Sequence, residues 1–276
     1  KHHHLIIFTD RGKCHWLKVH EIPSAGRASR GRAIINILQL EKDENPQAFL
    51  AVKEFDEDHF ILMATRRGLV KKTVLSAYKR PMRGGIYAID IREGDKLIEA
   101  RLTDGSNDVI LGSSNGKAIR FSESDVRPTG RKTMGVRGMR VQENEVVIGM
   151  IVIRRSGTVL AVSENGFGKR TGIDAYPLRR RGGKGVMTIR ITKKVGKMIS
   201  IKEVVDTDDL MIITEEGIMI RQPIASIRTI GRATQGVKLI RLDENDSIAS
   251  VTRVMEKAEN NGDEGIQKSP EADTET

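Results

Sequence analysis

The chain has 276 residues, of which 38% are hydrophobic, and a formal net charge of +10 at pH 7. This is enough apolar material for a folded core, but no apolar run approaches the roughly 20 residues of a membrane-spanning helix, and no secretory signal is visible. The single cysteine, Cys14, excludes an intrachain disulfide and is expected to be a buried apolar residue.

Residues 1–4 read KHHH, which is typical both of a purification-tag remnant and of a native linker. From residue 5 onward the sequence repeats itself. An apolar run, then Thr or Ser, two residues and a glycine recur five times, ending at Gly12, Gly68, Gly116, Gly166 and Gly217. A second glycine follows in each copy, at Gly31, Gly85, Gly135, Gly185 and Gly236. Such a recurrence predicts one supersecondary unit per repeat.

Each repeat is predicted to consist of β-strands. The run before the first glycine is short and apolar, and apolar and polar residues alternate after both glycines, as in strands with one buried face. Three or four strands in about 50 residues is the size of a propeller blade. We therefore predict an all-β, propeller-like disc of four-stranded blades over residues 5–255. Its five units fall at about 5–55, 59–104, 108–154, 157–205 and 209–255.

The charge is concentrated in the repeats. Residues 256–276 contain seven acidic residues and two lysines, so their net charge is −5 and that of residues 1–255 is +15. This acidic tail has few apolar residues and is expected to be disordered. A body this basic suits a polyanionic partner, of which nucleic acid is the commonest. The tail either competes weakly with that partner or serves only for solubility.

Basic residues return beside the second glycine of the repeat. Arg27, Arg131, Arg181 and Arg232 lie four residues before it, and Arg80 and Arg83 flank Pro81 at that place in the second copy. Equivalent positions of a radial array lie on one rim, so these loops would form a curved cationic track. An arginine beside a turn glycine can also be an ordinary solvated residue.

The excess of charge in residues 179–185, RRRGGKG, favours binding over a solvated turn. Arginine offers a planar fork to phosphate oxygens, and glycines let backbone N–H groups approach them. We expect Arg179, Arg180, Arg181 and Lys184 to be exposed. The full set of candidate phosphate-binding residues is Arg27, Arg30, Arg32, Arg80, Arg83, Arg131, Lys132, Arg137, Arg179, Arg180, Arg181, Gly182, Gly183, Lys184, Gly185 and Arg232.

The scarcity of aromatic residues, 4% of the chain, favours a duplex as the partner. Single-strand binders and sequence-specific RNA readers need exposed aromatic rings for stacking. Tyr78 and Tyr176 both stand ten residues after the first glycine of their repeats, where other copies have Ile or Val, so both are expected in the core. Binding to the phosphate backbone, without sequence preference, is the resulting prediction.

Four segments of the chain carry a resemblance to a known family: 8–38, 118–138, 166–186 and 231–242. They closely resemble the C-terminal domain of the DNA gyrase A subunit, and the likeness extends over residues 5–255. The resemblance implies a β-pinwheel whose blades exchange strands and whose basic rim wraps duplex DNA. It also implies work within an ATP-dependent type II topoisomerase that introduces negative supercoils. The implied partners are the B subunit, together with the other domains of the A subunit, in an A2B2 assembly in the bacterial cytoplasm at the nucleoid.

Two departures from the family pattern are visible. Family members usually have six blades, and their Q-R-R-G-G-x-G box lies in the first. Here five units are found, and the similar RRRGGKG has Arg179 where the box has Gln and lies in the fourth unit. We therefore expect a first blade with the true box upstream. The nearest alternative is the C-terminal domain of the topoisomerase IV A subunit, which recognises DNA crossings.

No catalytic chemistry is expected in this chain. The resemblance places the DNA-cleaving tyrosine, ATP and Mg²⁺ elsewhere in the holoenzyme, and the sequence contains no phosphate-binding P-loop, zinc-protease or serine-hydrolase motif. We accordingly expect no catalytic residue, metal ligand or cofactor. Two other classes stay open: a propeller scaffold for acidic proteins, and a propeller enzyme with a central site. The second is disfavoured because the recurring polar residues are arginines on loops.

Overall fold

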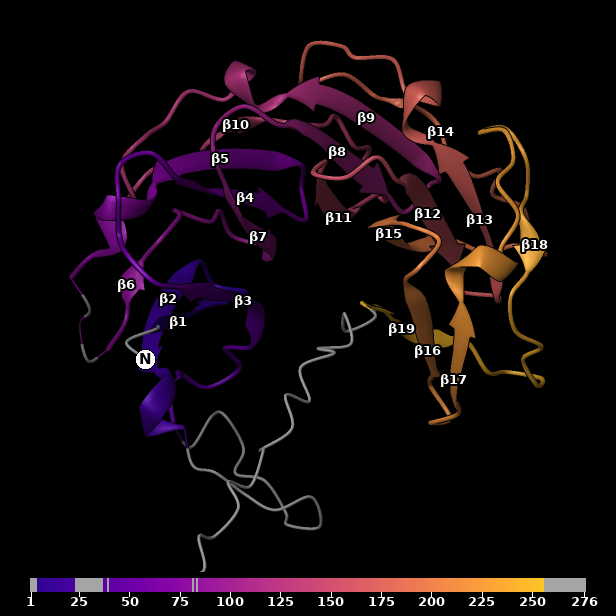
Figure 1. Ribbon diagram of the computed structural model, residues 1–276, viewed down its shortest axis with the longest axis horizontal. Helices are drawn as coiled ribbons and strands as arrows, with labels where there is room; N and C mark the ends of the chain where they lie inside the picture. Colours follow the sequence, from indigo (N-terminus) through magenta and orange to yellow (C-terminus); the bar gives the residue numbers. More distant parts are fainter. Residues whose placement is uncertain (1–3, 23–36, 39, 81, 83, 256–276) are drawn as a thin grey trace, which may run out of the picture.

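The computed structural model describes residues 4–22, 37–38, 40–80, 82 and 84–255. These residues form small antiparallel sheets arranged side by side in an arc (Figure 1). The predicted all-β, propeller-like fold of five blades is confirmed. The helices in the described part are short 3₁₀ turns: η1 (Val19–Glu21), η3 (Leu75–Tyr78), η4 (Glu123–Asp125), η5 (Ile173–Ala175) and η6 (Ile224–Ser226).

Each repeat contributes three main strands to its own blade. They are β1 (His4–Thr9), β2 (Lys13–Lys18) and β3 (Pro46–Val52) in the first blade, β4 (Phe60–Thr65), β5 (Leu69–Val74) and β7 (Leu97–Thr103) in the second, β8 (Asp108–Ser113), β9 (Lys117–Ser122) and β11 (Val147–Val152) in the third, β12 (Thr158–Ser163), β13 (Phe167–Gly172) and β15 (Met198–Val204) in the fourth, and β16 (Asp209–Thr214), β17 (Met219–Pro223) and β19 (Ile248–Val254) in the fifth.

A fourth, two-residue strand is donated by the following repeat. These strands are β6 (Ile86–Tyr87), β10 (Val136–Arg137), β14 (Val186–Met187) and β18 (Val237–Lys238). They pair with β2, β5, β9 and β13 respectively, so the first four sheets run β3-β1-β2-β6, β7-β4-β5-β10, β11-β8-β9-β14 and β15-β12-β13-β18. The fifth sheet has three strands in the described part of the chain, β17-β16-β19. The strand exchange that the resemblance implies is therefore present between neighbouring blades.

The core lies between successive blades rather than within one. The first strand of a blade is central in its sheet and packs on both faces, which is why β4, with the sequence FILMAT, is almost entirely buried. One cluster joins Phe8 of the first blade to Met63 and Tyr78 of the second. The third strands line the inner side of the arc, and the donated strands lie on its outer side (Figure 1).

Several residue-level expectations can now be compared with the structure. Cys14, Tyr78 and Tyr176 are buried with at most 1% exposure, as predicted. Residues 256–276 lie outside the described part of the chain, so their expected disorder stays a prediction. No helix in the described residues has the length and apolar character that crossing a membrane would require.

Candidate nucleic-acid interface

The second glycine of the repeat brings each donated strand against the blade before it. Gly185 has a φ of +76°, which an L-residue rarely adopts, and a Cβ there would stand 2.5 Å from the carbonyl oxygen of Ala118. Gly135 makes the same approach to the carbonyl of Val70. At these positions the backbone freedom of glycine serves strand donation, so the loop before the glycine is held at the outer edge of the preceding blade.

Successive loops are hydrogen-bonded to one another around the rim. The N–H of Gly182 donates to the carbonyl of Gly138 at 2.6 Å, and the N–H of Arg140 donates to Gly183 at 2.9 Å. In the same way the N–H of Arg190 donates to Thr234 at 2.9 Å. The loops of the third, fourth and fifth repeats therefore form one continuous track, as expected for equivalent positions of a radial array.

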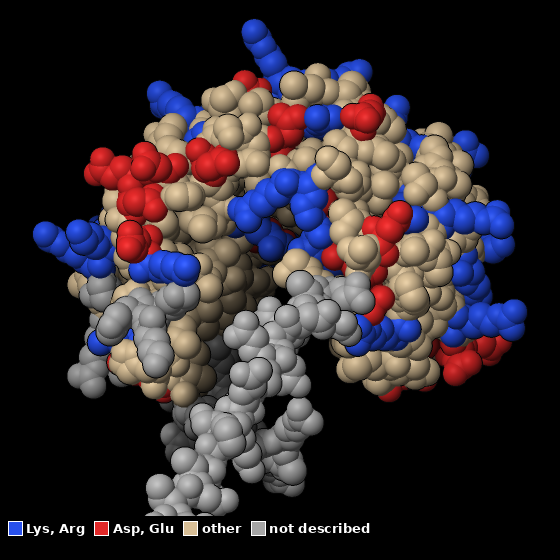
Figure 2. Space-filling model, viewed as in Figure 1, with Lys and Arg blue, Asp and Glu red and all other residues tan. Residues whose placement is uncertain are grey.

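The candidate cations divide into two groups by exposure. Arg80, Lys132, Arg137, Arg179, Arg180 and Lys184 are exposed. Arg131, Arg181 and Arg232 are half-buried. Arg27, Arg30, Arg32 and Arg83 lie outside the described residues. Lys and Arg side chains project at intervals along the outer margin of the arc, with groups of Asp and Glu between them (Figure 2).

Arg181 was expected to be exposed, and this expectation is wrong. Its Nε donates to the carbonyl of Asp125 at 2.9 Å and its Nη1 donates to that of Arg137 at 3.0 Å. Arg232 likewise donates to the carbonyl of Met187 at 3.1 Å. Both side chains fasten their own loop to the preceding one. The arginine four residues before the second glycine is thus partly a structural residue, because its guanidinium ties its own loop to backbone carbonyls of the preceding repeat.

The glycines of residues 182–185 also have internal roles that the sequence did not indicate. The N–H of Gly182 donates to the carbonyl of Gly138, and the carbonyl of Ala118 occupies the place where a Cβ of residue 185 would stand. Gly183 is exposed and has ordinary backbone angles. Of these three glycines only Gly183 is exposed, so it is the one that solvent or a phosphate can approach most readily.

Two buried lysines support the track from below, and sequence reasoning missed them. Lys169 is fully buried, and its Nζ donates to the carbonyls of Gly231 at 2.5 Å and Arg232 at 2.6 Å. Lys71 donates to the carbonyls of Ala88 and Arg131. Burial, reinforced by the neighbouring arginine charge, lowers the pKa of each ammonium to about 8. Aligning the repeats would have revealed a lysine where Ile119 and Ile220 stand in other copies.

The recurring residue four places after the first glycine is also structural. Lys72 donates to the carbonyl of Glu123 at 2.9 Å, and Arg170 donates from Nε to that of Ile227 at 2.7 Å. Arg120 reaches the carbonyls of Ile173 and Tyr176, both at 3.3 Å. These side chains hold the 3₁₀ turn of the next repeat. They are buried or half-buried and do not belong to the rim.

The family profile described as "DNA gyrase C-terminal domain, beta-propeller" matches residues 3–45, 59–104, 107–154, 157–204 and 208–255. The chain belongs to the DNA gyrase C-terminal domain family. The A subunit of DNA gyrase from Salmonella typhimurium (strain LT2) is 41% identical over 255 residues, covering 92% of this chain and 29% of that protein. The gyrase A subunit from Staphylococcus aureus (strain NCTC 8325) is 42% identical over 269 residues, covering 96% and 30%. The chain thus spans less than a third of these relatives.

Solved structures show the same fold. A C-terminal domain of DNA topoisomerase IV matches with a TM-score of 0.85 at 27% identity, over 92% of this chain and 79% of that one. A DNA gyrase A C-terminal domain matches with a TM-score of 0.79 at 25% identity, over 92% and 83%. Both branches of the family considered from the sequence are therefore represented among the structural neighbours. Within the described residues, no group of three His, Cys, Asp or Glu side chains is placed to hold a metal ion.

Proposed function

We propose that this chain wraps duplex DNA around its outer rim, without sequence preference, as the C-terminal part of a gyrase A subunit. The observation that carries the proposal is the hydrogen-bonded continuity of the cationic loops of the third to fifth repeats. Exposed Lys132, Arg137, Arg179, Arg180 and Lys184 stand along this track. Cations on a convex surface neutralise phosphates of a bent duplex, and such contacts carry no base sequence information.

Wrapping would give the DNA a crossing of fixed sign for a strand-passage enzyme. In this proposal the chain works in an A2B2 complex with the gyrase B protein in the bacterial cytoplasm, where ATP and Mg²⁺ act on other domains. Family membership and the gyrase A relatives support this assignment. The chain itself contributes binding and bending and no chemical step.

The test is the topology of DNA sealed while it is bound. Nicked circular DNA is ligated in the presence of increasing amounts of the chain, and the linking number of the purified product is measured. Wrapping predicts a linking-number change of one sign that grows with the amount of protein bound. Binding that leaves the linking number of the product unchanged contradicts wrapping.

The alternative, recognition of DNA crossings as in topoisomerase IV, is favoured by the topoisomerase IV domain among the structural neighbours. It predicts preferential binding to supercoiled over relaxed circles but no linking-number change on ligation. A scaffold for acidic proteins predicts a third result, which is no binding to plain duplex DNA at physiological salt. The same set of circles, relaxed, supercoiled and nicked, therefore separates the three functions.

A further inference from the structure

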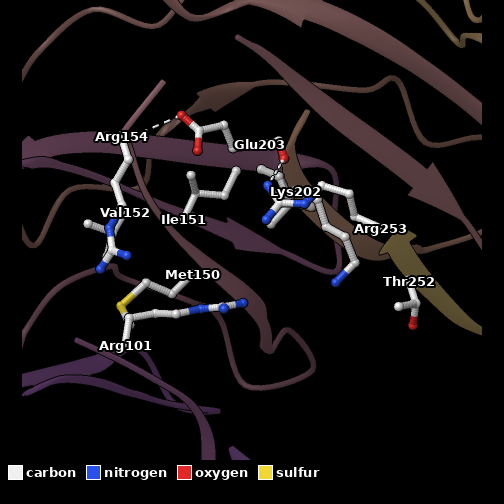
Figure 3. A pocket seen from close by; sticks show the side chains of 10 residues that line it. Arg101, Met150, Ile151, Val152, Arg154, Lys202, Glu203, Thr252 and Arg253 are labelled. Atoms are coloured by element: carbon white, nitrogen blue, oxygen red, sulfur yellow. Dashed lines mark hydrogen bonds between the residues drawn. The ribbon is translucent and has the colours of Figure 1, made fainter. Parts of the chain in front are cut away.

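A second concentration of positive charge lies on the inner side of the arc, away from the rim. There the third strands of neighbouring blades surround a cavity of about 320 Å³ (Figure 3). Its lining includes four cations, which we call the inner cation cluster: Arg101, Arg154, Lys202 and Arg253. Lys and Arg atoms are also visible in the hollow of the arc in Figure 2.

Each member of the cluster comes from a different blade. Arg101 is on β7, Arg154 follows β11, Lys202 is on β15 and Arg253 is on β19. Arg101 and Lys202 occupy equivalent places, since Arg101 pairs with Leu62 of β4 and Lys202 pairs with Leu160 of β12. Figure 3 shows both side chains extending into the same space. The fold itself therefore brings these charges together.

The acidic groups nearby are already paired, two of them outside the cluster and one with Arg101. Glu203 accepts from the backbone N–H groups of Arg154 at 3.1 Å and Arg155 at 3.0 Å. Asp208 pairs with Arg155 at 2.9 Å, and Glu99 pairs with Arg101 at 3.0 Å. The ammonium of Lys202 makes no hydrogen bond or ion pair with any residue that the structure describes. Arg154 donates to the carbonyl of Leu102, and Arg253 donates from Nη1 to that of Glu203 at 2.9 Å. The ammonium of Lys202 is therefore the main donor that protein acceptors leave available.

The electrostatics of the cluster favour an anion. Burial lowers the pKa of Lys202, and the positive charges of Arg101 and Arg253 oppose the attraction of Glu99. Burial and the charge of Arg155 likewise lower the pKa of Arg253. Like charges gathered in a partly desolvated space repel one another, and a bound anion would relieve that repulsion.

We propose that the inner cation cluster binds a small, multivalent oxyanion of the phosphate class. The guanidinium of Arg101 and the ammonium of Lys202 would donate to it from opposite sides, as arginine forks and lysine point charges commonly do for phosphate. The cavity volume suits a small ligand rather than a duplex. This site is separate from the rim, so it can be occupied while DNA is bound outside, and it does not depend on the function proposed for the rim.

The probe for the test is inorganic pyrophosphate, titrated calorimetrically into the full chain with sodium chloride adjusted to keep the ionic strength constant. We expect saturable binding of one pyrophosphate per chain. Lys202→Met and, separately, the more exposed Arg101→Gln should each raise its Kd about tenfold or more, because hydrogen bonds to charged groups are the strong ones. The control is Arg179→Ala/Arg180→Ala on the rim, which should leave this Kd unchanged. Circular dichroism and thermal unfolding establish that each variant is folded.

A second arm tests whether carboxylates of the chain compete with pyrophosphate for the site. The seven acidic residues of 256–276 are replaced by Gln or Asn in the full chain. Tighter pyrophosphate binding by this variant means that carboxylates of the chain compete for the site, and equal binding means that they do not. Either result supports an oxyanion site. Binding that never saturates, or that is lost in the rim variant and kept in folded Lys202→Met and Arg101→Gln, overturns the proposal.

Discussion

The residues of the rim divide into those that face solvent and those that fasten loops, and the two kinds should respond differently to truncation. Arg179→Ala/Arg180→Ala/Lys184→Ala should weaken duplex binding and reduce the salt slope of log K by about 0.9 for each phosphate that is no longer neutralised. Because these side chains are exposed, each of the three substitutions should change the free energy of unfolding by no more than roughly 0.5 kcal/mol. Arg181→Ala should instead cost about 1 kcal/mol, because it removes the two hydrogen bonds that fasten this loop to the carbonyls of Asp125 and Arg137. DNA titrations at several salt concentrations and urea unfolding measure the two effects. Unchanged DNA affinity in the triple variant would reduce this loop to a structural turn.

The buried lysines give stability a defined pH dependence. Lys71 and Lys169 have folded-state pKa values of about 8, below the ordinary value of 10.5. Between these values the unfolded lysines hold protons that the folded ones have released, so their contribution to the unfolding free energy increases as pH rises from about 8 to 10.5. Lys71→Met/Lys169→Met should remove this gain. The measurement is the unfolding free energy of parent and variant at pH 7.5 and 9.5, and a pH-independent difference would refute the lowered pKa values. Ile119 and Ile220 show that an apolar side chain is accommodated at this place in the repeat.

At the scale of the element, the donated strand depends on one glycine. Gly185→Val should destabilise the fold by several kcal/mol, since it adds a Cβ 2.5 Å from the Ala118 carbonyl and a branched residue at a φ of +76°. Gly183→Ala is the matched control, because its nearest neighbour beyond the adjoining chain is the flexible Ile119 Cδ1 at 3.3 Å and its φ is ordinary. Denaturant midpoints should separate the two variants clearly. Equal midpoints would mean that β14 is not needed to hold the blade.

The elements also show where sequence reasoning succeeds and where it ends. The main strands follow from local periodicity, and the burial of Tyr78 and Tyr176 follows from comparing equivalent positions in the five repeats. Val186–Met187 is too short to have a period of its own, so its pairing with Lys117 and Ala118 of the preceding repeat could not be derived from the residues alone. Lys169 lies at a position that alternation assigns to an apolar side chain. Its burial becomes intelligible only when the carbonyls of the next loop are seen above it.

For the whole molecule, charge is distributed between a basic fold and an acidic tail. Residues 256–276 carry a net charge of −5 on a segment tethered to a body of +15. A tethered segment has a local concentration on the order of millimolar near the fold, so it should compete with DNA, most visibly at low salt where screening is weakest. Replacing its seven acids by Gln or Asn should tighten duplex binding at low salt, and the curves should converge at high salt. Identical curves at both salt concentrations would show that the tail has no part in DNA binding.

The three-stranded fifth sheet gives the molecule a polarity. Each repeat donates its short strand to the repeat before it. In the described part β2, β5, β9 and β13 each pair with a donated strand, and β17 has none. Met219 is consequently 60% exposed, whereas Cys14 and Val70 at the same place in other blades are fully buried. Nothing lies within 4 Å of a Cβ built on Gly217. The amides of β17 should therefore exchange hydrogen faster than those of β5 or β9, which mass spectrometry can measure, and equal protection would contradict an uncovered edge. The edge strand β17 leaves backbone groups open to pairing. A strand donated there by another unit would extend the arc head to tail, in a single direction.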